Sequence, residues 1–577
     1  MSVDWPCLGF AALGHCAYDP GSPPIYFGLG DVVAALAFTL AAQQLLKPIF
    51  RFRLEARLLT IGRLYGAVFA GCAALIAAAV VPQLPFLRSS PVGYPILYEL
   101  FGTALFAGAY GALVLSILTP VRARSAAMQR FARASGQLLS EASEVVHVEY
   151  GEDLARSLPN LIRTAQFGER RRTSAFFDFT FRHQLENAAW AGSLLQILAD
   201  PQLCRSLVVR TPWRTARMIR QLGTEKLHAS AAEPLLRELG WQAIVTPESM
   251  LSRETGYHGF ATAGLLADSL FSDPFIIANY NPLDRFMFSR GLNLHDSELQ
   301  ARFKKAAKLA LQTIIDDRGN SHSYAAWRIS EFYENTAQAL WTEREEALAK
   351  TSGLIFAAMD GARLAIEFAE RLMASVSEEE YRAMYAETTD HEVRHDLLDP
   401  LVAIVVHTLS YASNEFADFN DRYWILVHDV FGRVFPEFGT QPDGMTPFQQ
   451  RVAIRISRKL ADNMKGYYPS ISKILLATLG PYDRRAGPTN ATAHKIIRDV
   501  VYSQLKGLRA LAANERKIFS DFLPANVTFD PATNSLTHRF RFGEERITNL
   551  SRIRPRRLSL LPDHVFRPQR SVTLEEH

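Results

Sequence analysis

The hydrophobic residues of this chain are concentrated in three long runs near its amino end. The runs cover residues 25–49, 58–81 and 94–120, and the rest of the sequence has nothing comparable. A bilayer with a hydrocarbon core about 30 Å thick requires about 20 apolar residues in a helix that crosses it. Each run is long enough, so the pattern predicts a three-span transmembrane helical bundle.

Basic residues beside the runs predict how the bundle is oriented. The loop after the first run and the segment after the third run are rich in arginine, whereas the loop between the second and third runs carries only Arg88. The basic residues of the two rich segments are Lys47, Arg51, Arg53 and Arg57, and then Arg122, Arg124, Arg130 and Arg133. Cationic loops stay on the cytoplasmic side of a membrane. We therefore expect a multi-pass protein of the inner (plasma) membrane, with its N-terminus outside and its C-terminus in the cytoplasm.

A cleaved signal peptide is the alternative interpretation of the first run. Signal peptides begin with basic residues, but residues 1–24 contain no Lys or Arg and include Asp4 and Asp19. We favour a retained span, which makes residues 1–24 an exterior segment. Oxidising conditions there would permit a disulfide between Cys7 and Cys16, although two free thiols fit the sequence nearly as well.

Small residues recur at helical spacing inside the second and third runs. They are Ala67 and Gly71, and then Ala104, Gly108 and Ala112. Such faces let helices approach closely in lipid. We favour packing within one bundle, and a homo-oligomer formed through these faces is the alternative.

Two ionisable residues, Arg63 and Glu99, lie within or near the apolar runs. Ionisable groups at membrane depth suggest function, but both are close enough to the end of a run for their side chains to reach the interface. A bundle with so few polar groups fits an anchor or a sensor better than a transporter.

Helical periodicity dominates from about residue 121 to 520, which predicts a mainly α-helical cytoplasmic region. The clearest helical segments are residues 152–167, 215–222, 299–316, 337–374 and 448–467. Near the end, apolar and polar residues alternate on both sides of the turn-forming tetrad PATN, which predicts a small C-terminal β-hairpin. We expect an exterior segment 1–24, transmembrane helices in 25–120, helical regions 121–290 and 291–385, a helical region with the hairpin in 386–544, and a basic flexible tail 545–577.

Composition narrows the class of function. The chain has 577 residues and a net charge of only +4, which does not by itself argue for a nucleic-acid partner. Cys72 and Cys204 are isolated and there is no CxxC motif, so cysteine-based zinc binding has no support. The arginines at 170–172 precede four phenylalanines between 176 and 181, a pattern that could stack nucleic-acid bases. Aromatic stripes usually pack inside proteins, so we favour a core helix there.

The stretch DHEVRHDLLDPLVAIVVH contains the motif HExxH. On a helix, His391 and His395 face the same way and could hold Zn²⁺, while Glu392 could activate a bound water. Glu415 follows 20 residues after His395, in an Asn-Glu pair. In this spacing the stretch resembles thermolysin-like gluzincin peptidases. The resemblance implies that His391, His395 and Glu415 are metal ligands and that Glu392 is the catalytic base of a membrane-anchored zinc peptidase.

The same histidine begins a second pattern. The segment HDLLDPLVAI resembles the phospho-accepting segment of sensor histidine kinases, which implies His395 as acceptor, Asp396 as an assisting base and Pro400 as a helix kink. Residues 420–577 lack the motifs of an ATP-binding domain. The plain alternative to both patterns is an exposed, charged turn followed by a buried helix, and we favour it because Arg394 and Asp396 place charges beside the histidines.

The sequence therefore predicts an integral inner-membrane protein that anchors a helical cytoplasmic interaction or signalling module. Its expected partners are the lipid bilayer and a cytoplasmic protein, with no nucleic acid. No cofactor is expected, and zinc would be bound only under the peptidase alternative. Histidine phosphotransfer through His395 is the third hypothesis.

Overall fold

The computed structural model of the chain is mainly helical, with one small antiparallel sheet. It describes residues 47–57, 61–81, 95–124, 127–141, 144–172, 182–255, 264–288, 292–317, 324–342, 348–375, 397–414 and 422–435, most of 446–456 and of 527–549, and Ala37. The chain forms two compact units, Met1–Ala243 and Ile244–His577.

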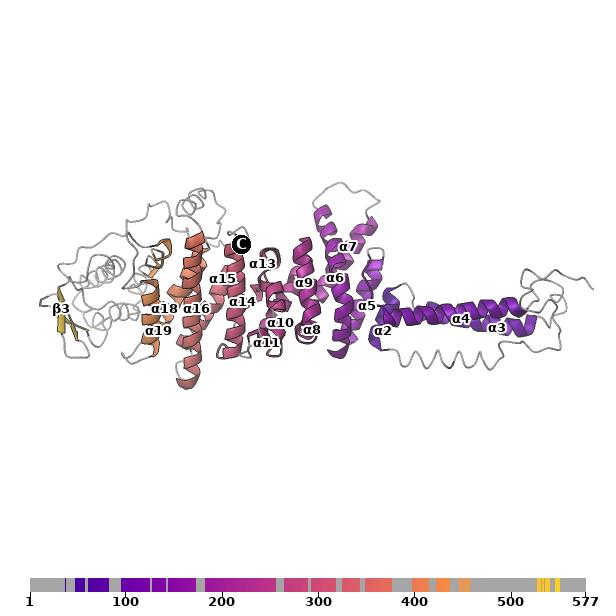
Figure 1. Cartoon of the computed structure of the whole chain (residues 1–577), viewed down its shortest axis with the longest axis horizontal. Coiled ribbons are helices and arrows are strands. Elements are labelled where there is room, and N and C mark those ends of the chain that lie inside the picture. The colour runs from indigo at the N-terminus through magenta and orange to yellow at the C-terminus, as the bar shows by residue number, and fades with distance from the viewer. Residues whose placement is uncertain are drawn as a thin grey trace, which may run out of the picture. The chain divides into compact units, whose positions relative to one another are not determined.

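The first unit contains the helices that Figure 1 draws in indigo and purple. They are α2 (Pro48–Ala56), α3 (Ile61–Val80), α4 (Pro95–Leu118), α5 (Met128–Glu141), α6 (Glu144–Arg172), α7 (Arg182–Ile197), α8 (Pro201–Arg210), α9 (Pro212–Glu225), the 3₁₀ helix η6 (Ser230–Ala232) and α10 (Glu233–Val245), which ends at the boundary between the units.

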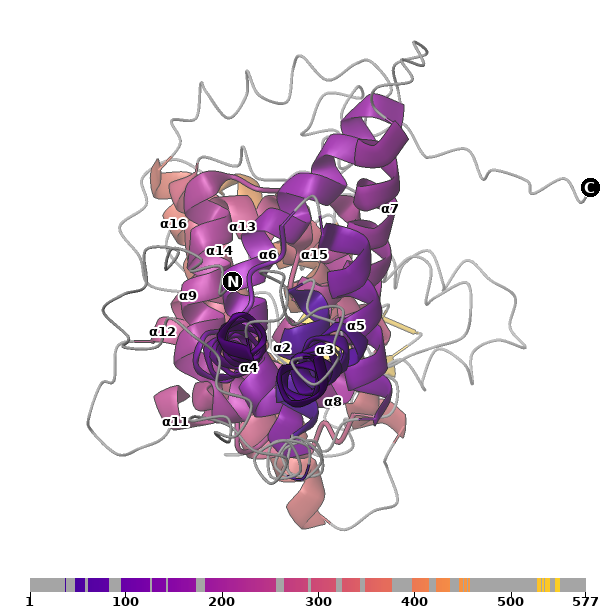
Figure 2. The same ribbon diagram turned by 90° about the vertical axis from the view of Figure 1, so that its right-hand side faces the viewer.

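Helices α3 and α4 pack against each other, and the end-on view of Figure 2 shows them as neighbours. They approach most closely where a glycine of each faces the other helix. A Cβ atom on Gly102 would lie 3.0 Å from the carbonyl oxygen of Gly71, and one on Gly71 would lie 3.1 Å from the ring of Phe106. The small-residue face of the second run thus packs against the third, as expected. Gly108 of the other small-residue face has no atom of the described residues within 4 Å of its Cβ position.

The expected three-span bundle is supported only in part. Within the described residues, one helix is long and apolar enough to cross a membrane, at Leu97–Leu115 of α4, and α3 offers a shorter apolar stretch, Gly62–Ala78. The first predicted span lies outside the described residues, except for Ala37 and its last few positions. Glu99, which we expected to reach the interface, is only 6% exposed.

The arginine-rich loop expected after the first run is instead largely a helix, α2. Its Phe52 packs edge-on against Phe131 of α5 and Tyr150 of α6, with ring centroids 5.6 and 5.3 Å apart. Pro48 stands in the first turn, where its missing N–H removes no helical hydrogen bond. The loop prediction considered only the basic residues and overlooked the apolar residues that alternate with them.

The second unit is built mainly from longer helices (Figure 1), and their packing departs from sequence order because α15 and α16 both pack against α18. Its elements are α11 (Met250–Thr255), α12 (Leu265–Phe271), α13 (Pro274–Tyr280), the 3₁₀ helix η7 (Asp284–Phe288), α14 (Ser297–Asp316), α15 (Tyr324–Thr342), α16 (Leu348–Ser375), α18 (Leu398–Asn414) and α19 (Arg422–Val434). The segment 337–374, expected as one helical segment, belongs to two helices, α15 and α16.

Aromatic side chains fill the core of the second unit. Phe303 of α14 stacks on Phe332 of α15, with centroids 3.6 Å apart, and Phe286 meets both rings edge-on. Helix α16 lies close to α15 at Gly361, where a Cβ atom would lie 2.6 Å from Cγ of the buried Tyr333 ring. Only a glycine therefore allows this approach.

The predicted hairpin is confirmed, and a third strand extends it. Strand β1 (Val527–Asp530) pairs antiparallel with β2 (Ser535–Arg539), and β2 pairs with β3 (Glu545–Asn549). The register places Arg539 opposite Glu545 at one end of the β2–β3 pair. Strand β3 lies at the start of the segment that we expected to be a flexible tail, so that expectation was wrong for residues 545–549.

Candidate functional site

The residues that follow α4 are bound to one face of α6. The N–H of Val121 donates to Asp153 Oδ1, and the N–H of Ala123 donates to Ser157 Oγ at 3.0 Å. Ser157 Oγ donates in turn to the carbonyl of Val121 at 3.2 Å, and Asn160 Nδ2 donates to the carbonyl of Ala123 at 3.3 Å. We call residues 119–124 the connector. Its backbone is held by polar side chains that recur on successive turns of α6.

Side chains alternate in direction along the connector. Val121 and Ala123 are buried, whereas Arg122 and Arg124 are exposed. Alternation with period two is typical of an extended backbone. The hydrogen bonds to α6 thus fix the position from which the Arg122 side chain extends.

A buried ion pair lies beside the connector. Arg53 Nε of α2 donates to Asp153 Oδ2 at 3.0 Å, and the two side chains are 9% and 0% exposed. Burial raises the pKa of Asp153 above its ordinary value, while the charge of Arg53 and the N–H of Val121 offset part of that shift. A carboxylate this deeply buried requires such partners, so α2, α6 and the connector depend on one another.

Arg57, the residue after α2, caps the end of α4. Its guanidinium donates to the carbonyl oxygens of Leu115 at 3.1 Å, Thr119 at 2.5 Å and Pro120 at 3.2 Å. The last carbonyls of a helix lack intrahelical donors and carry a partial negative charge. A cation at this position therefore stabilises the helix end and joins it to α2.

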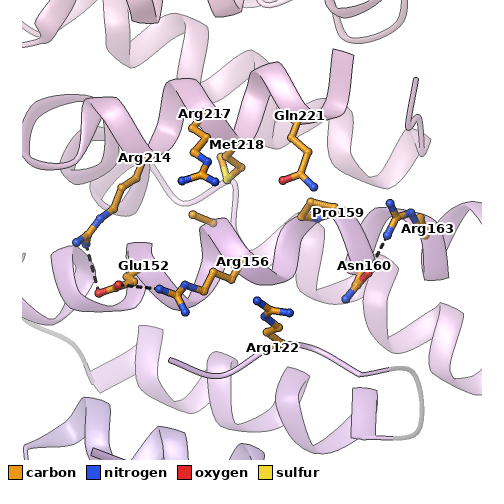
Figure 3. A pocket seen from close by; sticks show the side chains of 11 residues that line it. Arg122, Glu152, Arg156, Pro159, Asn160, Arg163, Arg214, Arg217, Met218 and Gln221 are labelled. Carbon is orange, nitrogen blue, oxygen red and sulfur yellow. Dashed lines mark hydrogen bonds and ion pairs between the residues drawn. The ribbon is translucent and has the colours of Figure 1, made fainter. Parts of the chain in front are cut away.

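The face of α6 next to the connector opens into a pocket of about 590 Å³. The pocket lies between α6 and α9, and the connector closes one side (Figure 3). It is lined by Arg122 of the connector, by Glu152, Ala155, Arg156, Pro159, Asn160 and Arg163 of α6, and by Arg214, Arg217, Met218 and Gln221 of α9. Side chains three, four or seven positions apart on a helix share one face, which explains both helical sets.

The pocket is strongly basic. Five arginines and a single glutamate line it, so its side chains carry four net positive charges. Arg156 and Arg214 share the carboxylate of Glu152, each at 3.5 Å, and Arg163 pairs with Glu225 outside the lining. Within the part of the chain that the structure describes, Arg122 and Arg217 have no carboxylate within ion-pair distance. Figure 3 shows them reaching toward α6 from opposite sides.

The predicted metal and phosphotransfer residues lie outside the described residues. They are His391, Glu392, His395, Asp396 and Glu415. The peptidase and phosphotransfer hypotheses therefore stay predictions. Among the residues that the structure does describe, no group of three His, Cys, Asp or Glu side chains could hold a metal ion. The helix that follows the histidines, α18, is buried as the plain alternative predicted, with Val402, Ile404 and Val406 almost inaccessible.

Sequence reasoning used Arg53, Arg57 and Arg122 only as orientation signals and did not find the pocket. The ion pair joins residues 100 positions apart, and Arg57 reaches acceptors about 60 positions away. One signal was available: arginines recur every three residues along α9, at 214, 217 and 220. This spacing predicts a basic face on that helix.

Comparison with known proteins gives no match: no family model, no curated protein and no solved structure is similar to this chain.

Proposed function

We propose that this chain is an integral membrane protein whose amino-terminal helices anchor a helical cytoplasmic module for interaction or signalling. The observation that carries the proposal is the direct attachment of α4 to the rest of the first unit. Arg57 binds the end of α4, and Asp153 and Ser157 bind the connector that leaves it. A displacement of α4 along its axis would therefore act directly on α6.

The surface of the α3–α4 pair supports the anchor. Nine of the fifteen large apolar side chains that are exposed among the described residues belong to these two helices. They are Phe69, Ile76, Val80, Leu97, Leu100, Phe101, Val114, Leu115 and Leu118. Exposed apolar side chains concentrated on one helix pair in this way typically contact lipid or another protein.

The position of the charges supports the cytoplasmic orientation. The exposed or partly exposed residues Lys47, Arg57, Arg122 and Arg124 all flank the same end of the α3–α4 pair, where α3 begins and α4 ends. Lys and Arg beside a span favour the cytoplasmic side and attract anionic headgroups by about 1 kcal/mol each.

Cysteine labelling in cells tests the topology. In a chain whose four native cysteines are replaced, Gln129→Cys places a thiol on the exposed surface of α5, and Leu100→Cys places one on the apolar surface of α4. A membrane-impermeant maleimide should label Gln129→Cys only after the cells are opened, and should label Leu100→Cys only after detergent is added. Labelling of Gln129→Cys in intact cells, or of Leu100→Cys without detergent, would contradict the proposal.

A further inference from the structure

The basic pocket between α6, α9 and the connector gathers five guanidinium groups around one recess that is open to solvent. Arg122, Arg156 and Arg217 approach it from the connector, α6 and α9. Like charges that converge in this way repel one another, and the single carboxylate of the lining, Glu152, is shared between Arg156 and Arg214 at 3.5 Å each. A bound anion would relieve this repulsion.

The donors of the pocket identify the class of anion. Guanidinium groups present planar pairs of N–H donors that match the oxygens of a phosphate, and they remain charged at every physiological pH. Asn160 and Gln221 add amide groups that could bind further oxygens. The volume of about 590 Å³ is far larger than one phosphate needs and lies in the range of small-molecule sites.

We infer that the pocket binds an anion with two or more phosphoryl groups, held mainly by Arg122, Arg156 and Arg217. The ligand could be a free polyphosphate compound or the headgroup of a diphosphorylated lipid, since both present the same chemistry. This inference goes beyond the proposed function, because the pocket lies wholly within the first unit. The pocket would bind the anion whether α3 and α4 are covered by lipid or by another protein.

Binding would have a mechanical consequence. Arg122 extends from the connector, whose neighbouring residues Val121 and Ala123 are hydrogen-bonded to α6. A ligand that touches Arg122 and Arg217 together would tie α9 to the connector. It should therefore slow amide hydrogen exchange in residues 121–124.

Calorimetry on the full chain, purified in a neutral detergent, tests the inference with inorganic triphosphate as the free probe. Mixed micelles that contain cardiolipin, a lipid with two phosphates, provide the second arm. We expect Arg122→Gln and Arg217→Gln each to weaken binding about tenfold. Arg217→Lys should weaken it less, because the charge remains while the paired donors are lost. Arg220→Gln is the matched control, because it removes the same charge from α9 outside the pocket lining.

Triphosphate binding that depends on Arg122 and Arg217 but not on Arg220 supports a free ligand. The same dependence seen only with cardiolipin supports a lipid headgroup. No binding of either probe, or equal losses in the Arg217 and Arg220 variants, overturns the inference. Because the three side chains are exposed, an unchanged circular dichroism melt verifies that each variant is folded.

Discussion

Replacing Arg53 with methionine would leave the carboxylate of Asp153 buried without its cation. The Asp153 side chain has no exposed surface, and its remaining described partner is the N–H of Val121. Removing one member of a buried ion pair typically costs about 3–5 kcal/mol, because the charge left behind stays desolvated. For a unit of this size, that loss corresponds to a decrease of about 6–20 °C in Tm.

The second variant in this test is Asp153→Asn, alone and together with Arg53→Met. The asparagine oxygen can still accept the N–H of Val121, and no buried charge remains opposite the methionine. The double variant should therefore be more stable than Arg53→Met alone, with a coupling free energy of about 1–3 kcal/mol between the two sites. If the stability lost in the double variant equals the sum of the losses in the two single variants, the ion pair is not the link between α2 and α6.

The pH dependence gives an independent check. Burial already raises the pKa of Asp153 in the wild-type protein, and loss of Arg53 should raise that pKa further. A folded state that binds the proton more tightly than the unfolded state becomes relatively more stable as pH falls. The defect of Arg53→Met should therefore shrink as the pH is lowered from neutrality, because Asp153 takes up its proton in the folded state before it does so in the unfolded chain.

The assay can be made specific for the first unit. Cys204 is fully buried in α8, so its thiol reacts only when this unit opens. Thermal melts followed by labelling of Cys204, with the other three cysteines replaced, report the stability of the first unit separately from that of the second.

Two further predictions concern helix packing and capping. Gly361→Ala should destabilise the second unit by about 1–3 kcal/mol, because the new methyl group overlaps the ring of Tyr333. Gly353 lies in the same helix, and a Cβ atom there would be 3.7 Å from its nearest neighbour, the carbonyl oxygen of His295. Gly353→Ala should therefore be neutral or stabilising in the same melt. Arg57→Ala should speed amide exchange in the last turn of α4, because the guanidinium contacts to the carbonyls of Leu115, Thr119 and Pro120 are lost. Arg51→Ala removes an exposed charge of α2 and should leave that exchange unchanged.

The helices and the hairpin could be predicted because their signals are local. The third apolar run corresponds to α4, whose ends lie within two residues of the predicted bounds. The turn tetrad PATN lies between β1 and β2. Strand β3 was missed because it pairs β2 across a short connection that has no comparable turn signal. Helix α2 was missed because its basic residues masked an amphipathic pattern.

The sequence by itself determined the mainly helical class, the apolar runs and the arginines that flank them, since each depends on residues that are near neighbours in the chain. Tertiary structure decided what those arginines do. Arg53 became half of a buried ion pair, Arg57 a helix cap and Arg122 part of a pocket, through partners that lie far away along the chain. The same guanidinium charge serves all three roles, so only the packing of α2, α6 and α9 around it distinguishes one role from another.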